Sequence, residues 1–488
     1  MNIGTGTIVG LALLALAAMA VLALWFRFRP RDFLLMAAVC FPVVWFSRLD
    51  HVPLMVVGQH VPLHWLVLVG VTVLAWPFAD RRTAAAAGPM FRRVLGPLAV
   101  LVVVMFISIL ANARGTQDIL LGMRALMFVI LPIVAAWRVI QSIPLDEEAL
   151  KRVVLMLFMI AALTAGLSVV SALTPKIFIT LLATSETAEQ ESARGFTTLG
   201  GANTTGTALA CVACVASGCV LAGYRRTLSL AMLVLCFLGI VTTLARAAML
   251  AFVLSQAYVF LRLTKGFARR LALFAAIGLF LLVPATYRLA RDYSYSLERF
   301  LVLHEDSAVA RRVALEAAFR YGLDHPVVGG GWGLLYPYGR AVMATRDLPS
   351  VWYVGNIATP VVKPHTLYGV VFAETGLIGL LLLLLYFWRI WNALSPPDPR
   401  LDQRGNGLVA GFRASFICIA IIAFFQDDLF LLSKLAYVLY LASLTGIVAK
   451  AYCQVRIRAR SPAWAAGATG TSAVMPVTAN LPPSLTIR

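Results

Sequence analysis

Residues 94–111 read VLGPLAVLVVVMFISILA and contain no charged side chain. A helix rises about 1.5 Å per residue, so this stretch is long enough to cross most of the ~30 Å hydrocarbon core of a bilayer. Because backbone amides in lipid must find partners within their own segment, the stretch predicts a membrane-spanning α-helix. The rest of the chain is similar: 61% of its 488 residues are hydrophobic and 13% are charged. A soluble domain carries about 25% charged residues, so this composition is typical of a membrane protein.

Comparable apolar blocks follow one another along the chain. Thirteen are marked by their length, at 4–26, 33–48, 61–79, 94–111, 119–137, 153–173, 203–223, 228–245, 247–261, 271–287, 366–388, 408–426 and 429–449. We therefore expect an all-α polytopic membrane protein with about 12–13 transmembrane helices and one large, partly helical periplasmic loop. The first block has its arginines after it, which favours a retained helix over a cleaved signal peptide.

The basic residues predict the orientation. Every second connection is rich in Arg and Lys, and these connections contain Arg27/Arg29/Arg31, Arg81/Arg82/Arg92/Arg93, Arg138/Lys151/Arg152, Arg225/Arg226, Arg262/Lys265/Arg269/Arg270, Arg389/Arg400/Arg404 and Lys450/Arg456/Arg458/Arg460. Basic loops stay in the cytoplasm, so the N-terminus and the long loop face the periplasm of a bacterial inner membrane. The same distribution accounts for the net charge of +19, and we expect no nucleic acid partner.

These boundaries divide the chain into four parts. Residues 1–287 hold transmembrane helices 1–10, and residues 288–364 form the periplasmic loop. Residues 365–452 hold helices 11–13. Residues 453–488 become rich in Ala, Pro, Ser, Thr and Gly, which predicts a disordered cytoplasmic tail.

Two arginines are predicted near the periplasmic ends of apolar blocks. Arg246 follows Thr242-Thr243-Leu244-Ala245 in a hairpin with almost no loop, and Arg124 lies about a turn inside its block. Ionisable residues are costly at such positions and indicate a functional site. Snorkelling to the membrane surface is the alternative for each of them.

The periplasmic loop contains one amphipathic segment. Apolar or small residues at 315, 318, 319, 322 and 323 share a helical face, which extends back to Arg311 and Arg312. The helix is expected to end at Asp324-His325-Pro326, before the glycine-rich run 329–333. A helix lying on the membrane surface, with arginine at one end, suits an anionic lipid head group, and simple snorkelling is again the alternative.

His365 opens the apolar block after the loop. His365 and Tyr368 share one helical face, whereas Glu374 is predicted to face away, so we expect no direct His–Glu pair. A neutral imidazole at the membrane–water boundary suits general-base catalysis. Gly376 and Gly379 predict close helix packing.

In order and spacing, these motifs resemble the O-antigen ligase and O-antigen polymerase superfamily. The similarity lies in the hairpin arginine, the run from Arg311 to Gly331, and His365-x-x-Tyr368 followed by Glu374-x-Gly376. The resemblance implies a membrane glycosyltransferase that moves a glycan from undecaprenyl pyrophosphate to an acceptor hydroxyl, with no metal or other cofactor. It makes residues 288–364 a catalytic loop.

The resemblance also implies residue roles. Arg246 and Arg311 match arginines that contact the donor pyrophosphate, and His365 matches the histidine near the acceptor. We therefore predict a catalytic set of His365, Arg246 and Arg311, a pyrophosphate-binding set that adds Arg312 and Arg124, and supporting roles for Tyr368, His325 and Gly331. The expected partners are an undecaprenyl-pyrophosphate-linked glycan donor, lipid A-core or a growing glycan as acceptor, and membrane lipids.

Three alternatives remain at this point. An O-antigen or exopolysaccharide polymerase would use the same donor chemistry as a ligase, and the slightly basic loop favours the ligase, because lipid A-core is phosphorylated. A transporter or flippase would need buried acidic residues or histidines near the bilayer midplane, which are scarce here. A scaffold or sensor would not need arginine and histidine on one face.

Overall fold

The computed structural model describes residues 55–56, 59–60, 62–173, 197, 199, 201–263, 305–335, 365–395, 403–426 and 433–459. Within them, the strands β1 (Met55–Val56) and β2 (Gln59–His60) form a two-residue antiparallel hairpin. All the other elements are helical. They are α3 (Leu63–Ala75), η2 (Trp76–Phe78), α4 (Arg81–Asn112), α5 (Thr116–Gln141), α6 (Glu147–Leu173), α9 (Ala202–Leu221), α10 (Arg226–Thr243), α11 (Arg246–Leu263), α14 (Glu305–Asp324), α16 (Leu367–Ala393), α17 (Gln403–Ile422) and α19 (Ser433–Ala459).

The all-α polytopic membrane fold is confirmed. Eight of the described helices are long and apolar enough to cross a membrane: α4, α5, α6, α9, α10, α16, α17 and α19. The predicted blocks at 61–79 and 247–261 coincide with α3 and α11. The blocks at 4–26, 33–48 and 271–287, and most of the tail at 453–488, lie outside the described residues.

α4 begins well before its apolar block. Asp80 starts the helix, because its carboxylate Oδ2 accepts a hydrogen bond from the amide of Thr83 at 2.7 Å. The alanine-rich segment that follows favours a helix even though it carries Arg81, Arg82, Arg92 and Arg93. The basic residues predicted for a loop therefore lie on the first turns of α4, since hydropathy marks the part in lipid rather than the whole helix.

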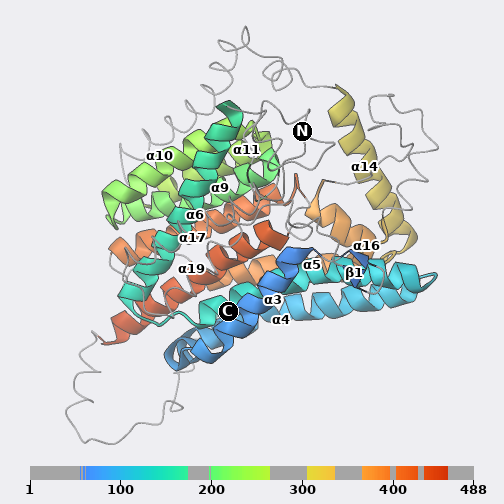
Figure 1. Cartoon of the computed structure of the whole chain (residues 1–488), viewed down its shortest axis with the longest axis horizontal. Helices are drawn as coiled ribbons and strands as arrows, with labels where there is room; N and C mark the ends of the chain where they lie inside the picture. Colours follow the sequence, from blue (N-terminus) through green and yellow to red (C-terminus); the bar gives the residue numbers. More distant parts are fainter. Residues whose placement is uncertain are drawn as a thin grey trace, which may run out of the picture.

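The helix ends gather at two opposite ends of the bundle (Figure 1). At one end, hereafter the site end, the amide of Leu367 donates to the carbonyl of Ala423 at 2.9 Å, joining the start of α16 to the end of α17. Thr207 of α9 donates to Gln426 beyond α17, also at 2.9 Å. Each connection that meets there was predicted to lie on the same side of the membrane.

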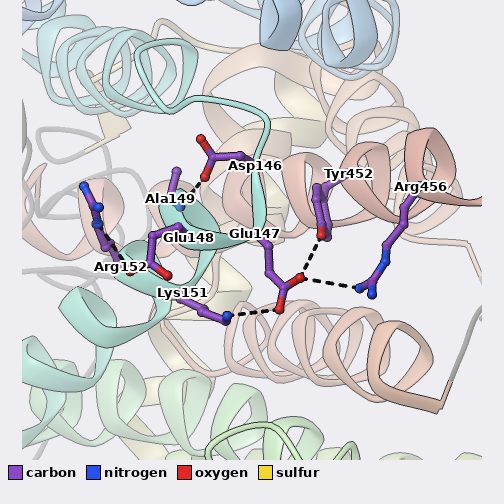
Figure 2. Close-up of polar contacts among 8 residues, drawn as sticks. All are labelled: Asp146, Glu147, Glu148, Ala149, Lys151, Arg152, Tyr452 and Arg456. Carbon is purple, nitrogen blue, oxygen red and sulfur yellow. Dashed lines mark hydrogen bonds and ion pairs between the residues drawn. The ribbon is translucent and has the colours of Figure 1, made fainter. Parts of the chain in front are cut away.

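The opposite end is closed by polar contacts between α6 and α19 (Figure 2). The Glu147 carboxylate lies 3.0 Å from Lys151 and 3.6 Å from Arg456, and it accepts a hydrogen bond from the Tyr452 hydroxyl at 3.2 Å. Asp146 accepts a hydrogen bond from the Ala149 amide at 2.6 Å and caps α6. This end of the bundle therefore contains residues that were predicted to be cytoplasmic.

α9 forms the centre of the bundle and is buried along almost its whole length. Its small residues allow neighbouring backbones to come close, as expected for helix packing in membranes. A Cβ atom on Gly218 would collide with the backbone of Gly407 and Gly411 on α17. This close approach fixes the position of α17 against α9. The end of α17 that supports His365 is fixed with it.

α16 is broken at Gly376, where φ is 66° and ψ is −165°. The rings of Tyr368 and Phe387 lie 6.1 Å apart, although 19 residues of straight helix would separate them by about 28 Å. Leu367 also lines one small cavity with Tyr386. The first turns of α16 therefore fold back along its second half. The prediction of one continuous helix through residues 366–388 is wrong in this respect.

Candidate functional site

Arg246 lies at the site end, as the hairpin motif predicted. Only Leu244 and Ala245 separate α10 from α11, and Leu244 adopts a left-handed conformation with φ of 55°. The hydroxyl of Thr243 accepts a hydrogen bond from the amide of Ala245 at 3.3 Å, which stabilises the turn. Arg246 is the first residue of α11, and its side chain is exposed.

The hairpin packs tightly against the start of α9. A Cβ atom on Gly206 would lie 3.0 Å from Ala245 and 3.1 Å from Ala248. One residue further along α9, Thr207 holds Gln426 next to the end of α17. The position of Arg246 is therefore tied to the end of α17, which also supports α16.

His365 stands directly before α16 and is exposed. Its φ of 50° is a left-handed value, which is uncommon for a residue other than glycine and is found at functional sites when neighbouring contacts enforce it. Those contacts come from the end of α17: Ala423 accepts hydrogen bonds from the amide of Leu367 at 2.9 Å and the hydroxyl of Thr366 at 3.5 Å. The described structure thus ties His365 and Arg246 to the same end of α17.

Tyr368 and His325, both predicted to support the site, have clear packing roles. The Tyr368 hydroxyl donates to the carbonyl of Ala420 at 3.2 Å, and its ring lies 4.4 Å from the ring of Phe424. The ring of His325 is exposed and meets the edge of Tyr321 at 5.3 Å. Tyr368 therefore holds the start of α16 to α17, and His325 lies at the end of α14.

The glycine-rich run forms a compact loop inside the break of α16. Gly329, Gly331 and Gly333 have φ values of 71°, 106° and 79°, which residues with a side chain rarely adopt. The amide of Gly330 donates to the carbonyl of Ala373 at 3.0 Å. Trp332, within the run, is fully buried. The loop is part of the fold and connects α14 firmly to α16.

The side chain of Glu374 binds this loop, a role that was not predicted from the sequence. Its carboxylate accepts hydrogen bonds from the amides of Gly333 at 2.9 Å and Leu335 at 3.2 Å, and only 6% of the residue is exposed. Its carbonyl accepts from the hydroxyl of Ser108 at 2.6 Å and the amide of Gly331 at 3.2 Å. An acidic residue in an apolar block, downstream of several glycines, was the available signal.

The predicted supporting residue Gly331 lies at the centre of this network. Its amide also contacts the hydroxyl of Ser108 on α4 at 3.1 Å. Asn112, one turn further along α4, donates to the carbonyl of Gly329 at 3.0 Å. α4, α16 and the end of α14 are thereby locked together at the site end.

The remaining predicted arginines divide into two groups. Arg124 is half-buried on α5, two residues after Gly122. Gly122 lies close to the glycine loop, because a Cβ atom added to it would be 2.9 Å from the carbonyl oxygen of Trp332. Arg124 therefore belongs to a helix that contacts the glycine loop. Arg311 and Arg312 lie on α14, and their side chains are outside the described part of the structure.

The predicted site residues thus lie on elements that contact one another at the site end. Arg246 and His365 are linked through α9 and α17, and Arg124 and α14 are linked through the glycine loop. Within the residues that the structure describes, no three His, Cys, Asp or Glu side chains lie close enough together to hold a metal ion.

Comparison with protein families finds a match that spans several of these elements. The family model described as O-antigen ligase (Wzy_C) matches residues 231–384. This range covers the α10–α11 hairpin, α14, the glycine loop and the broken start of α16, and so contains Arg246, Arg311 and His365. A search of curated proteins finds no match. From residue 231 to residue 384, the chain is therefore similar to the O-antigen ligase family, whose members are glycan-transferring enzymes.

Proposed function

We propose that the protein is an O-antigen ligase-like glycosyltransferase of the bacterial inner membrane. It transfers a glycan from an undecaprenyl pyrophosphate carrier to a hydroxyl of lipid A-core at the periplasmic face. The observation that carries this proposal is that Arg246 and His365 stand at the same end of α17, inside the range that matches the O-antigen ligase family.

The distribution of charge supports a periplasmic site. The end opposite the site holds Arg81, Arg138, Lys151 and Arg226, at the starts or ends of their helices. Basic residues next to membrane spans are retained in the cytoplasm. The site end then faces the periplasm, where nucleotide sugars are absent and a lipid-linked donor is the available source of activated glycan.

The arginines suit the leaving group of this reaction. When the bond from the anomeric carbon to the pyrophosphate oxygen breaks, its electron pair stays on the undecaprenyl pyrophosphate. A guanidinium group is permanently charged and offers a planar fork that binds two phosphate oxygens at once. We assign this role to Arg246 and Arg311, assisted by Arg312 and Arg124, because charge stabilisation in the transition state is a large part of such catalysis.

His365 is assigned the role of general base. The acceptor hydroxyl oxygen forms the new bond to the anomeric carbon and gives its proton to the imidazole. Attack from the side opposite the leaving group inverts the anomeric configuration. His365 is exposed at the site end, and the contacts of Thr366 and Leu367 with Ala423 hold its left-handed backbone there.

An apolar groove beside this site suits the hydrocarbon tail of the donor. The groove has a volume of about 290 Å³, lies between α16 and α17, and is lined by aromatic and aliphatic residues. One of them, Phe424, packs on Tyr368, three residues from His365. A polyprenyl chain lying there would bring its pyrophosphate to the site end.

Glycan analysis in a deletion strain tests the proposal. The strain is complemented with wild type, Arg246→Ala or His365→Ala, and both surface glycans and extracted lipid-linked glycans are separated on gels. We expect long lipid-linked chains that fail to reach the surface acceptor in all strains except the wild-type complement. Single repeat units without a ladder would assign a polymerase instead, and unchanged glycans in every strain would reject glycan transfer.

A further inference from the structure

α14 carries an exposed apolar stripe. Leu315, Phe319 and Leu323 recur every fourth residue, so they share one helical face, and the last two are 50% and 67% exposed. The adjacent side of α14 packs into the protein, where Ala318 and Tyr321 contact Leu335 and Ala373. Phe319 lies at the boundary between the two sides, because its half-exposed ring is 5.7 Å from the ring of Phe372 on α16. Three large apolar side chains in a row on a helix outside a membrane would be costly to expose to water.

The neighbouring face of the same helix is polar. Glu316 and Arg320 form an ion pair at 2.7 Å, and the Arg320 side chain is more than half exposed. The surface of α14 that points away from the protein is therefore amphipathic. An apolar stripe, which favours hydrocarbon, lies beside a charged face, which favours water. This is the pattern of a helix that lies in a membrane interface.

The turn after α14 is joined to a spanning helix. Val327, in this turn, is also exposed. At this point the amide of Leu377, the first residue after the break in α16, donates to the carbonyl of Pro326 at 2.9 Å. Leu377 and Leu381 are exposed on the second half of α16, which is long and apolar enough to cross a membrane. Exposed apolar side chains therefore lie on α14, on the turn that follows it, and on the second half of α16, to which that turn is hydrogen-bonded.

The direction of α14 agrees with this surface. Figure 1 shows α14 running steeply across the site end, while α4 and α5 run side by side along the length of the bundle. α14 is thus strongly inclined to α4 and α5, which are long and apolar enough to cross the membrane (Figure 1).

We propose that α14 is an interfacial membrane helix, with Leu315, Phe319 and Leu323 inserted among the phospholipid acyl chains of the leaflet at the site end. The anchor fixes the depth of the helix that carries Arg311 at the level of lipid head groups. The proposal goes beyond glycan transfer, because it concerns how the loop meets the bilayer whatever reaction the site performs.

Site-specific fluorescence in phospholipid vesicles tests the anchor. Leu323→Cys and Arg320→Cys are labelled with an NBD maleimide, and the wild-type protein reports background labelling; its described cysteines are buried. We expect the label at 323 to be quenched by doxyl lipids and to be reduced several-fold more slowly by aqueous dithionite than the label at 320. Phe319→Cys should behave like Leu323→Cys, which guards against a local effect of one substitution.

Two results would overturn the anchor. Equal and fast dithionite reduction at 320 and 323 would mean that the stripe faces water. Protection of both stripe positions from dithionite and from doxyl lipids would mean that protein, rather than lipid, covers the stripe. Neither readout depends on catalysis, so failure of the anchor is distinguishable from failure of the proposed transferase.

Discussion

The carboxylate of Glu374 accepts a hydrogen bond from the amide of Gly333 at 2.9 Å, and this contact joins the glycine loop after α14 to the membrane-spanning part of the protein. The two residues are 41 positions apart in the sequence. Because the same carboxylate also binds the amide of Leu335, one buried side chain holds both ends of a turn. Glu374 thereby fixes α14 relative to α16. Arg311 lies on α14, and His365 lies just before α16.

Removal of this carboxylate should loosen the loop. Glu374→Ala leaves the amides of Gly333 and Leu335 without their partner, at about 1–3 kcal/mol for each buried donor. Glu374→Gln keeps one acceptor oxygen and should lose less. Thermal unfolding in detergent should therefore rank wild type above Gln and Gln above Ala. Glu316→Gln, on the exposed face of α14, is the control and should unfold like wild type. Equal stability of all four proteins would contradict the role given to Glu374.

A side chain at the break in α16 should be poorly tolerated. Gly376→Ala places a Cβ in a backbone conformation reserved for glycine, at about 1–3 kcal/mol, and drives it into the carbonyl of Val327. We expect reduced yield of folded protein in detergent extracts, measured by size-exclusion chromatography. Gly166→Ala on α6, where a Cβ meets nothing within 4 Å, should be neutral or should stabilise by roughly 0.5–1 kcal/mol. Wild-type yield of Gly376→Ala would show that the break is not required.

Replacement of Arg246 by lysine should test whether the planar guanidinium group is needed in addition to the positive charge. Arg246→Lys keeps one positive charge but loses the planar fork, so glycan transfer should fall by about tenfold or more, equivalent to ~1.4 kcal/mol of transition-state stabilisation. Initial rates in membranes with matched protein levels provide the measurement. Arg226→Lys, on the same hairpin but at the opposite end, should keep the wild-type rate. Wild-type transfer by Arg246→Lys would remove Arg246 from pyrophosphate binding.

The contacts at the opposite end should matter far less. Glu147 is partly exposed, and exposed ion pairs contribute about 0–1 kcal/mol. Glu147→Gln should therefore lower the thermal stability only slightly and leave the rate of glycan transfer unchanged. A large loss of transfer, with the protein still folded, would mean that the contacts between α6 and α19 communicate with the site.

Much of the fold could be predicted from local patterns. Block length and the alternation of basic loops predicted which helix ends meet, and the contacts of Leu367 with Ala423 and of Thr207 with Gln426 agree with that division. The hairpin at Arg246 was visible because only this residue separates the apolar blocks at 228–245 and 247–261. These features depend on neighbours in the sequence, so composition and spacing are sufficient.

The geometry of α16 could not be predicted in the same way. Residues 366–388 are mostly apolar and contain no proline, so glycine was the only local sign of a break. The energy that holds the break comes from Pro326, Gly333 and Leu335, which are distant in the sequence. Glu374 was expected to face away from His365 on a continuous helix. In the described structure its carboxylate binds the backbone amides of Gly333 and Leu335, and backbone amides cannot be recognised from residue type.

The central claim is that His365 accepts the proton of the attacking hydroxyl during glycan transfer. Its most direct test is the initial rate of transfer by purified protein in vesicles, with an undecaprenyl-pyrophosphate-linked glycan and lipid A-core, for wild type and His365→Gln. Thermal unfolding of both proteins provides the control, because an exposed residue before α16 should not determine stability. We predict that wild type forms the product and releases undecaprenyl pyrophosphate, while an equally stable His365→Gln forms none. Transfer by the variant at the wild-type rate would contradict the assignment of His365 as the base.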